Sequence, residues 1–260
     1  MSKLAAELQR LEMERCTGIL RAGDGAFHLV SGMVAAADCR RTPGLERLAV
    51  AAGVASAADL LRARTGSPHE LTGVPRLESL ALLSVFDAAY LLLATPSAPE
   101  FQPAPPHWLA AACHIPPRAL VRECARRGDP AAGPWPVDLI DRAPVVPVHR
   151  IRRRRLVLTG GQVEVLAAAD ARRTIAALAR ELGRTTYGCL LAVRALTAAG
   201  LIEPPLPAAI TEPAPPARPE TERLPRRHAR HAAPDPVPNR WAPVDHNTLI
   251  RLRAALEGLA

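Results

Sequence analysis

Four residues in the middle of the chain are of the types that bind metal ions. They follow the spacing H-x5-C-H-x9-C and are His107, Cys113, His114 and Cys124. A structural zinc site needs four converging ligands, which usually come in closely spaced pairs. Here a proline pair at 116–117 interrupts the set, and Cys124 falls on a predicted helix, so the ligands do not form pairs. We therefore predict no metal site and no other cofactor.

Other motifs that carry catalytic chemistry are also missing from the sequence. It has no phosphate-binding P-loop, no HExxH zinc-protease motif, no GxSxG nucleophile motif and no glycine-rich dinucleotide turn. Asp24 lies between two glycines, where a turn residue is expected rather than an acid catalyst. We therefore expect a protein that binds other molecules and is not an enzyme.

Arginine is the main candidate for a binding residue in this sequence, because a guanidinium group binds phosphate well. Residues 1–149 carry 15 Lys+Arg and 15 Asp+Glu, whereas residues 150–260 carry 18 and 10, so the whole net charge of +8 lies in the second part. Together with Thr186, seven arginines form a candidate DNA-backbone site: Arg152, Arg153, Arg154, Arg155, Arg172, Arg173 and Arg194. A second interpretation stays open. Lys3 is the only lysine, so the excess also fits an arginine-rich composition, or a strand edge protected by charge.

The segment 159–203 must position several of these side chains. It has the pattern of three helices and a strand: Leu182-Gly183 ends the second helix, Thr185 or Thr186 caps the third, and residues 199–202 lead into the strand. This order and the closing Leu…Ala-Gly-Leu-Ile resemble the helix-turn-helix core of bacterial winged-helix repressors. The resemblance implies a winged-helix domain, a frame that normally docks on DNA.

The third predicted helix of this segment lacks the side chains of a base reader. Its spacing assigns three residues to the core side: Cys189, Val193 and Leu196. The outward positions go to Tyr187, Leu190, Leu191, Ala192 and Ala195. Only Thr186 and Arg194 would then reach a base edge or a phosphate, and base discrimination needs hydrogen-bonding side chains. We expect Tyr187, Leu190 and Leu191 to form a protein contact: with a partner protein, in a homodimer, or against the first half of the same chain.

The first half of the chain alternates helical and strand patterns. We expect helices at 4–15, 44–52, 57–64, 77–93 and 117–127, short strands at 19–21, 26–30 and 33–37, and an extended segment at 101–108. Three motifs, together with the helix at 120–127, resemble the PATAN (PatA N-terminal) domain family over about residues 1–128: Thr17-Gly18-Ile19-Leu20, Phe27-His28-Leu29 and Gly32-Met33-Val34. The resemblance implies a non-catalytic scaffold of bacterial signalling proteins, found with winged-helix domains and with small-GTPase and roadblock systems.

The last quarter of the sequence changes character twice. Residues 204–243 hold 12 prolines, which favours an extended linker that builds no core. From residue 244 a helical pattern returns, with one apolar stripe that would contact a groove of this chain or of a partner: Leu249, Leu252, Leu256 and Leu259.

The sequence thus predicts an α+β protein in four segments. These are a PATAN-like scaffold at 1–145, a winged-helix domain at 146–205, a Pro-rich linker at 206–243 and an amphipathic docking helix at 244–260. Five cysteines without a CxxC pair indicate reduced thiols and a cytoplasmic location. The longest apolar run, at 80–95, is interrupted by Ser84 and Asp87, so no membrane role is expected. We expect a transcriptional-regulator type of protein or, alternatively, a signalling adaptor that does not bind DNA.

Overall fold

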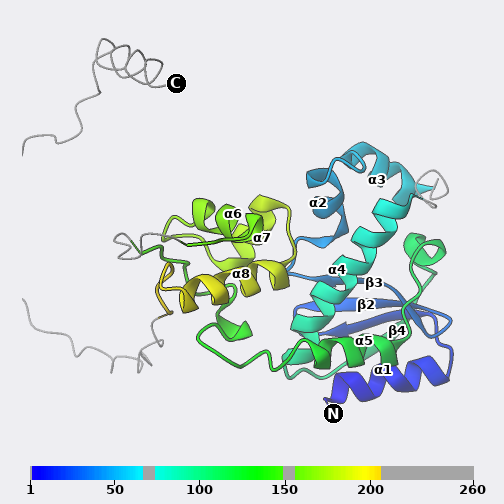
Figure 1. Cartoon of the computed structure of the whole chain (residues 1–260). Coiled ribbons are helices and arrows are strands. Elements are labelled where there is room, and N and C mark those ends of the chain that lie inside the picture. Colours follow the sequence, from blue (N-terminus) through cyan, green and yellow to red (C-terminus); the bar gives the residue numbers. More distant parts are fainter. Residues whose placement is uncertain (1, 67–73, 149–155, 206–260) are drawn as a thin grey trace, which may run out of the picture. The chain divides into compact units, whose positions relative to one another are not determined.

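The computed structural model describes residues 2–66, 74–148 and 156–205 (Figure 1). All of them belong to the first of two compact units, Met1–Ala209. Three predicted features lie outside the described residues: the arginines at 152–155, the Pro-rich linker at 206–243, and the C-terminal helix with Leu249, Leu252, Leu256 and Leu259.

The described first half is built on a four-stranded antiparallel sheet. β1 (Gly18–Ala22), β2 (Gly25–Val30) and β3 (Met33–Cys39) form the predicted meander, and β4 (Glu100–Pro103) pairs with β1. The strand order is β3-β2-β1-β4, so β3 and β4 are the edge strands. The meander is confirmed, whereas residues 100–103 were expected only to be extended.

Helices cover one face of this sheet, to which the fully buried Leu20, Phe27 and Leu29 point. The α-helices of the first half are α1 (Lys3–Met13), α2 (Gly44–Ala51), α3 (Ala57–Thr65), α4 (Pro75–Ala94) and α5 (Pro117–Arg126). Two 3-10 turns, η2 (Trp108–Ala111) and η3 (Val137–Leu139), lie in the segments before and after α5. Figure 1 shows α4 running beside β3 and α1 next to α5. The mixed α+β class is therefore confirmed for the described residues.

Helix α4 is the central element of the core. By length and composition alone it is long and apolar enough to cross a membrane, yet 56% of that stretch is buried inside the fold. Its buried residues include one carboxylate, Asp87, which is 1% exposed. This burial pattern is that of a core helix around which the other elements pack.

Three further helices follow in the predicted order: α6 (Gly160–Ala168), α7 (Ile175–Leu182) and α8 (Thr186–Ala198). Thr185 caps α8, because its side chain accepts a hydrogen bond from the Gly188 N–H. Gly183 ends α7 in the left-handed region, as the Leu-Gly pair predicted. The expected strand at 199–202 is reduced to one isolated bridge, which joins Ile202 to Pro147.

One continuous apolar core runs from α1 to Ile202. It includes Trp135 and Val145, which precede α6, as well as Val165 and Leu196 within the three helices. Residues on both sides of position 145 therefore bury their side chains against one another. This shared core fixes the orientation of α8 relative to α4.

Gly183 allows α2 to lie close to the end of α7, because it has no side chain. Its φ is +59°, and a Cβ built there would lie 2.1 Å from the Cβ of Ala51. We expect Gly183→Ala to lower the free energy of unfolding by more than the roughly 1–2 kcal/mol of a left-handed alanine, because the clash adds to that cost. Urea denaturation measures the loss.

Gly200→Ala is the matched control for this variant. Gly200 also has a positive φ, of +74°, but nothing lies within 4 Å of a Cβ built there. The control isolates the cost of the backbone conformation alone. Equal losses in the two variants would contradict a tight contact between Gly183 and Ala51.

Candidate functional site

The orientation of α8 about its own axis determines which of its side chains point outward. Thr186 is fully buried, and its hydroxyl donates to the Arg41 carbonyl oxygen at 2.8 Å. Leu190 is also fully buried, whereas Leu191 is 45% exposed. The expectation that Thr186 and Leu190 point outward was therefore wrong. Thr186, Leu190 and Val193 follow the helical repeat, so all three lie on the buried side together.

Arg194 is used within the fold rather than on its surface. Its guanidinium donates to the Trp135 carbonyl oxygen at 2.8 Å and to the Pro130 carbonyl oxygen at 3.2 Å. Trp135, fully buried, donates its indole N–H to the Thr197 hydroxyl at 2.9 Å. The expectation that Arg194 is free to bind a phosphate was wrong, because the loop around Trp135 occupies its donors.

The remaining described arginines of the predicted DNA-backbone site differ from each other. Arg173 pairs with Glu181 at 2.8 Å and donates to the Ala168 carbonyl oxygen at 3.0 Å. Arg172 has an exposed side chain. Among the described residues of that predicted site, Arg172 is thus the one best placed to meet an external phosphate.

Tyr187 is half-buried and takes part in a ring cluster. Its ring meets that of Tyr90 edge-on, with centroids 4.8 Å apart. The Arg127 guanidinium lies 4.6 Å from the centroid of the same ring. Tyr187 therefore packs against α4 and α5 and offers an interface only part of its surface.

The outward side of α8, called the α8 face below, consists of Gly188, Leu191, Ala195 and Ala198, all exposed. None of these side chains carries a hydrogen-bonding group. Beside it a groove of about 270 Å³ runs between α4, α6 and α8, lined by Leu80, Leu83, Val165, Gly188, Cys189 and Ala192. Leu83 and Val163, 48% and 50% exposed, add apolar surface on α4 and α6. The α8 face itself is therefore small and aliphatic, whereas Arg184 and Thr185 add polar groups to the groove.

A buried carboxylate fixes the start of α8. Asp87, on α4, accepts hydrogen bonds from the backbone N–H groups of Thr186 at 2.8 Å and Tyr187 at 2.7 Å. Burial raises the pKa of the Asp87 carboxyl from 3.8 to about 6, although both N–H groups and the charge of Arg127 act in the opposite direction. Nothing in the local sequence around either residue indicates this contact, which joins positions 99 and 100 residues apart.

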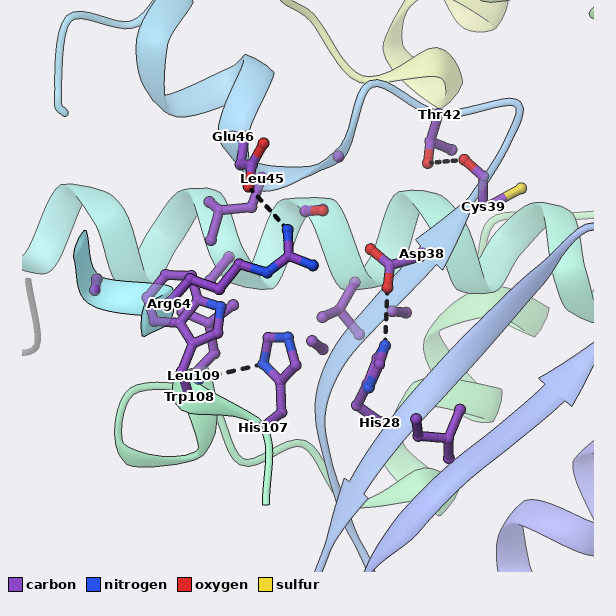
Figure 2. A pocket seen from close by; sticks show the side chains of 18 of the residues that line it. His28, Asp38, Cys39, Thr42, Leu45, Glu46, Arg64, His107, Trp108 and Leu109 are labelled. Carbon is purple, nitrogen blue, oxygen red and sulfur yellow. Dashed lines mark hydrogen bonds and ion pairs between the residues drawn. The ribbon is translucent and has the colours of Figure 1, made fainter. Parts of the chain in front are cut away.

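A second concave region, of about 1180 Å³, lies against β3 and holds two histidines (Figure 2). His28 on β2 contacts Asp38 on β3 through Nε2 and Oδ2 at 2.8 Å, and this bond lowers the pKa of Asp38. The His28 side chain is 19% exposed and that of Asp38 is 71% exposed, so the carboxylate is open to solvent. The sequence did not predict this pair, because strand alternation alone does not show which residues of two neighbouring strands lie side by side.

His107 adds a second imidazole to this cavity. Its ring centroid is 4.7 Å from that of His28 and 5.8 Å from that of Trp108. Burial lowers the pKa of His107 to about 4, with help from the charge of His28, so the ring is neutral at pH 7. Its Nδ1 accepts the Leu109 N–H at 3.2 Å, which leaves the proton on Nε2.

The cavity does not assemble the groups of a metal site. Within the described residues, no cluster of three or more histidine, cysteine, aspartate or glutamate side chains has the geometry to hold a metal ion. Cys113 and Cys124 are buried, and burial raises the pKa of their thiols to about 11 and about 12. Such thiols are protonated at neutral pH and behave as apolar core residues.

Comparison with known proteins gave no match to any family model, curated protein or solved structure.

Proposed function

We propose that this chain is a non-enzymatic regulatory protein that works by binding another protein on the α8 face. In this proposal α6–α8 form a winged-helix frame, and the first half is a PATAN-like scaffold that takes the signal from a partner. The observation that carries it is the composition of the α8 face: Gly188, Leu191, Ala195 and Ala198 offer no donor or acceptor to a base edge.

The test is the effect of Leu191→Asp on a partner complex. An apolar side chain that is buried in an interface leaves water favourably, and an aspartate in its place carries an unpaired charge into the contact. We expect a partner that co-purifies with the tagged full chain to bind the variant at least about 10-fold more weakly. Titration calorimetry with the purified partner measures this change.

Met13→Asp provides the matched control, since Met13 is 78% exposed on α1, away from α8. Its complex should keep the affinity of the unchanged chain. If Leu191→Asp binds as tightly as the control, the α8 face is not the interface. If the partner is a second copy of the chain, sedimentation of the two variants should show a homodimer for Met13→Asp that dissociates in Leu191→Asp.

The exposed Arg172 side chain favours a second candidate function, regulation near DNA through phosphate contacts. We expect random-sequence duplex DNA to bind the full chain weakly, with an affinity that falls as salt rises, and Arg172→Glu to reduce that salt dependence by about one counterion. Fluorescence anisotropy at two salt concentrations measures both. If no DNA binds even at low salt, regulation near DNA is excluded and the protein-binding adaptor remains.

A further inference from the structure

In the described part of the chain, the outer edge of β3 is paired near its start, and at its end the Cys39 carbonyl oxygen accepts hydrogen bonds from the Thr42 N–H and hydroxyl. Val34 exchanges two backbone hydrogen bonds with Ile115, at 2.9 and 3.0 Å. A β-bulge follows, because the pairing with β2 shifts between His28 and Leu29. Past the bulge, the pairing of β3 with β2 determines which backbone groups face the free edge.

One backbone hydrogen bond at the end of β3 shows which residues face β2. The Arg40 N–H donates to the Asp24 carbonyl oxygen on the β2 side at 3.1 Å. In an antiparallel ladder, alternate residues turn both backbone groups to the same side. Ala36 and Asp38 therefore turn theirs toward β2, and Ala37 turns its N–H and C=O toward the free edge.

The cavity described above wraps around this edge. Five consecutive residues, 36–40, line it, although successive side chains of a strand point to opposite faces. Figure 2 shows Asp38 and the two histidines beside β3, and Ala81 and Val85 of α4 also line the cavity. The cavity thus follows the backbone of β3 rather than one face of the sheet.

The backbone of Ala37 faces the cavity from a buried position. Ala37 is 4% exposed, and within the described residues no backbone bond from outside the sheet reaches it. A buried N–H and C=O pair needs partners, because leaving such groups unsatisfied costs about 1–3 kcal/mol each. A ligand that offers a donor and an acceptor at strand spacing satisfies both.

We propose that a segment of a partner protein binds along β3 in an extended conformation, as a fifth strand of the sheet. An extended peptide presents N–H and C=O groups in the required pattern, and it adds to an open sheet edge through main-chain bonds. Ile115 already pairs with this edge at Val34 in the same way, so the peptide continues an existing ladder. This proposal is independent of the α8 face.

The walls of the cavity define the side chains of the peptide. Alternate residues of a bound strand would face Ala81 and Val85, which favour small apolar groups. The residues between them would face Asp38, whose open carboxylate has one oxygen engaged by His28. Arg40 and Arg64 also line the cavity, and Arg64 pairs with Glu46 at 3.8 Å rather than with Asp38. A basic side chain complements the other oxygen of Asp38, so the expected ligand alternates apolar and basic residues.

The experiment uses a displayed library of random 12-residue peptides, selected on the full chain. Enriched peptides should alternate apolar and basic residues, bind at least tenfold more weakly to Ala37→Pro, which lacks the outward N–H, and lose affinity for Asp38→Asn. Leu191→Asp, on the other surface, should bind them unchanged, which separates this proposal from the function proposed above. Failure to enrich any peptide, or equal binding to Ala37→Pro, would overturn it.

Hydrogen exchange gives a second measurement in case the proline variant does not fold. The amide of Ala37 should exchange in the free chain and become protected when an enriched peptide is added. Unchanged exchange on addition of peptide contradicts the proposal. Protection in the free chain that disappears when residues 67–73 are replaced by a Gly-Ser segment would show that this chain covers its own edge, and would also overturn it.

Discussion

Leu190→Asp is expected to abolish folding of the described unit, whereas Leu191→Asp should leave it intact. Leu190 is fully buried in the core that α8 shares with α4. The substitution removes a large apolar side chain, at a cost of about 2–5 kcal/mol, and adds a charge that finds no partner in an apolar site. Together these costs approach the total of about 5–15 kcal/mol that stabilises a typical domain.

Leu191 is the matched control, because it is the next residue on the same helix and is 45% exposed. A charge there stays in water, and surface substitutions of this kind change the free energy of unfolding by about 0.5 kcal/mol. Circular dichroism and urea denaturation of the two variants measure the difference. Equal stability of the pair would mean that the register of α8 differs from the one described.

The second large effect concerns the carboxylate at the start of α8. Asp87→Ala should lower the free energy of unfolding by about 2–4 kcal/mol at pH 7, because it leaves two buried N–H groups without acceptors. These are the backbone groups of Thr186 and Tyr187. The release of a buried charge offsets part of the loss. Urea denaturation followed by the fluorescence of the buried Trp135 reports the transition.

Asp59→Ala is the control for this substitution. Asp59 also accepts a backbone hydrogen bond, from the Ser56 N–H at 2.9 Å, but on the exposed start of α3. Removing it exposes its donor to water, and loss of such a cap typically costs about 1 kcal/mol. A loss in Asp87→Ala no larger than in this control would contradict a structural role for the buried contact.

The raised pKa of Asp87 also predicts a pH dependence. Its folded-state pKa of about 6 lies above the ordinary value of 3.8, so the folded chain binds the proton more tightly than the unfolded chain. The stability from this group is therefore fully present below about pH 4 and is lost as pH rises through about 6. Asp87→Asn removes this titration, so the stability of the unchanged chain relative to the variant should fall between pH 4 and 6. A constant difference would show that the carboxyl stays ionised throughout.

Local signals in the sequence predicted most of the described elements. The glycine turns fixed the meander to within two residues, and the predicted helix at 57–64 appears as Ala57–Thr65. Gly183 marked the end of α7 correctly, and Thr185 is the one of the two expected caps, Thr185 or Thr186, that starts α8. These signals work because turn and cap preferences depend on a few adjacent residues.

The candidate site could not be predicted in the same way, because distant residues determine it. The sequence assigned Cys189, Val193 and Leu196 to the core side correctly, but it placed the pair at 190–191 outward. Asp87 and Arg41 hold Thr186 in the interior, and Leu190 is buried one turn further on, so the buried side of α8 is wider than predicted. His28 and Asp38 likewise meet only through strand pairing.

The shared core limits which fragments of this protein can fold alone or be exchanged between proteins. A fragment that starts at residue 146 would leave behind Trp135, Val145 and the carboxylate of Asp87, all of which the three later helices need. Exposed apolar surface of that kind leads to aggregation, so expression of the isolated fragment should fail. Gene fusions that exchange α6–α8 between proteins would have to carry α4 with them.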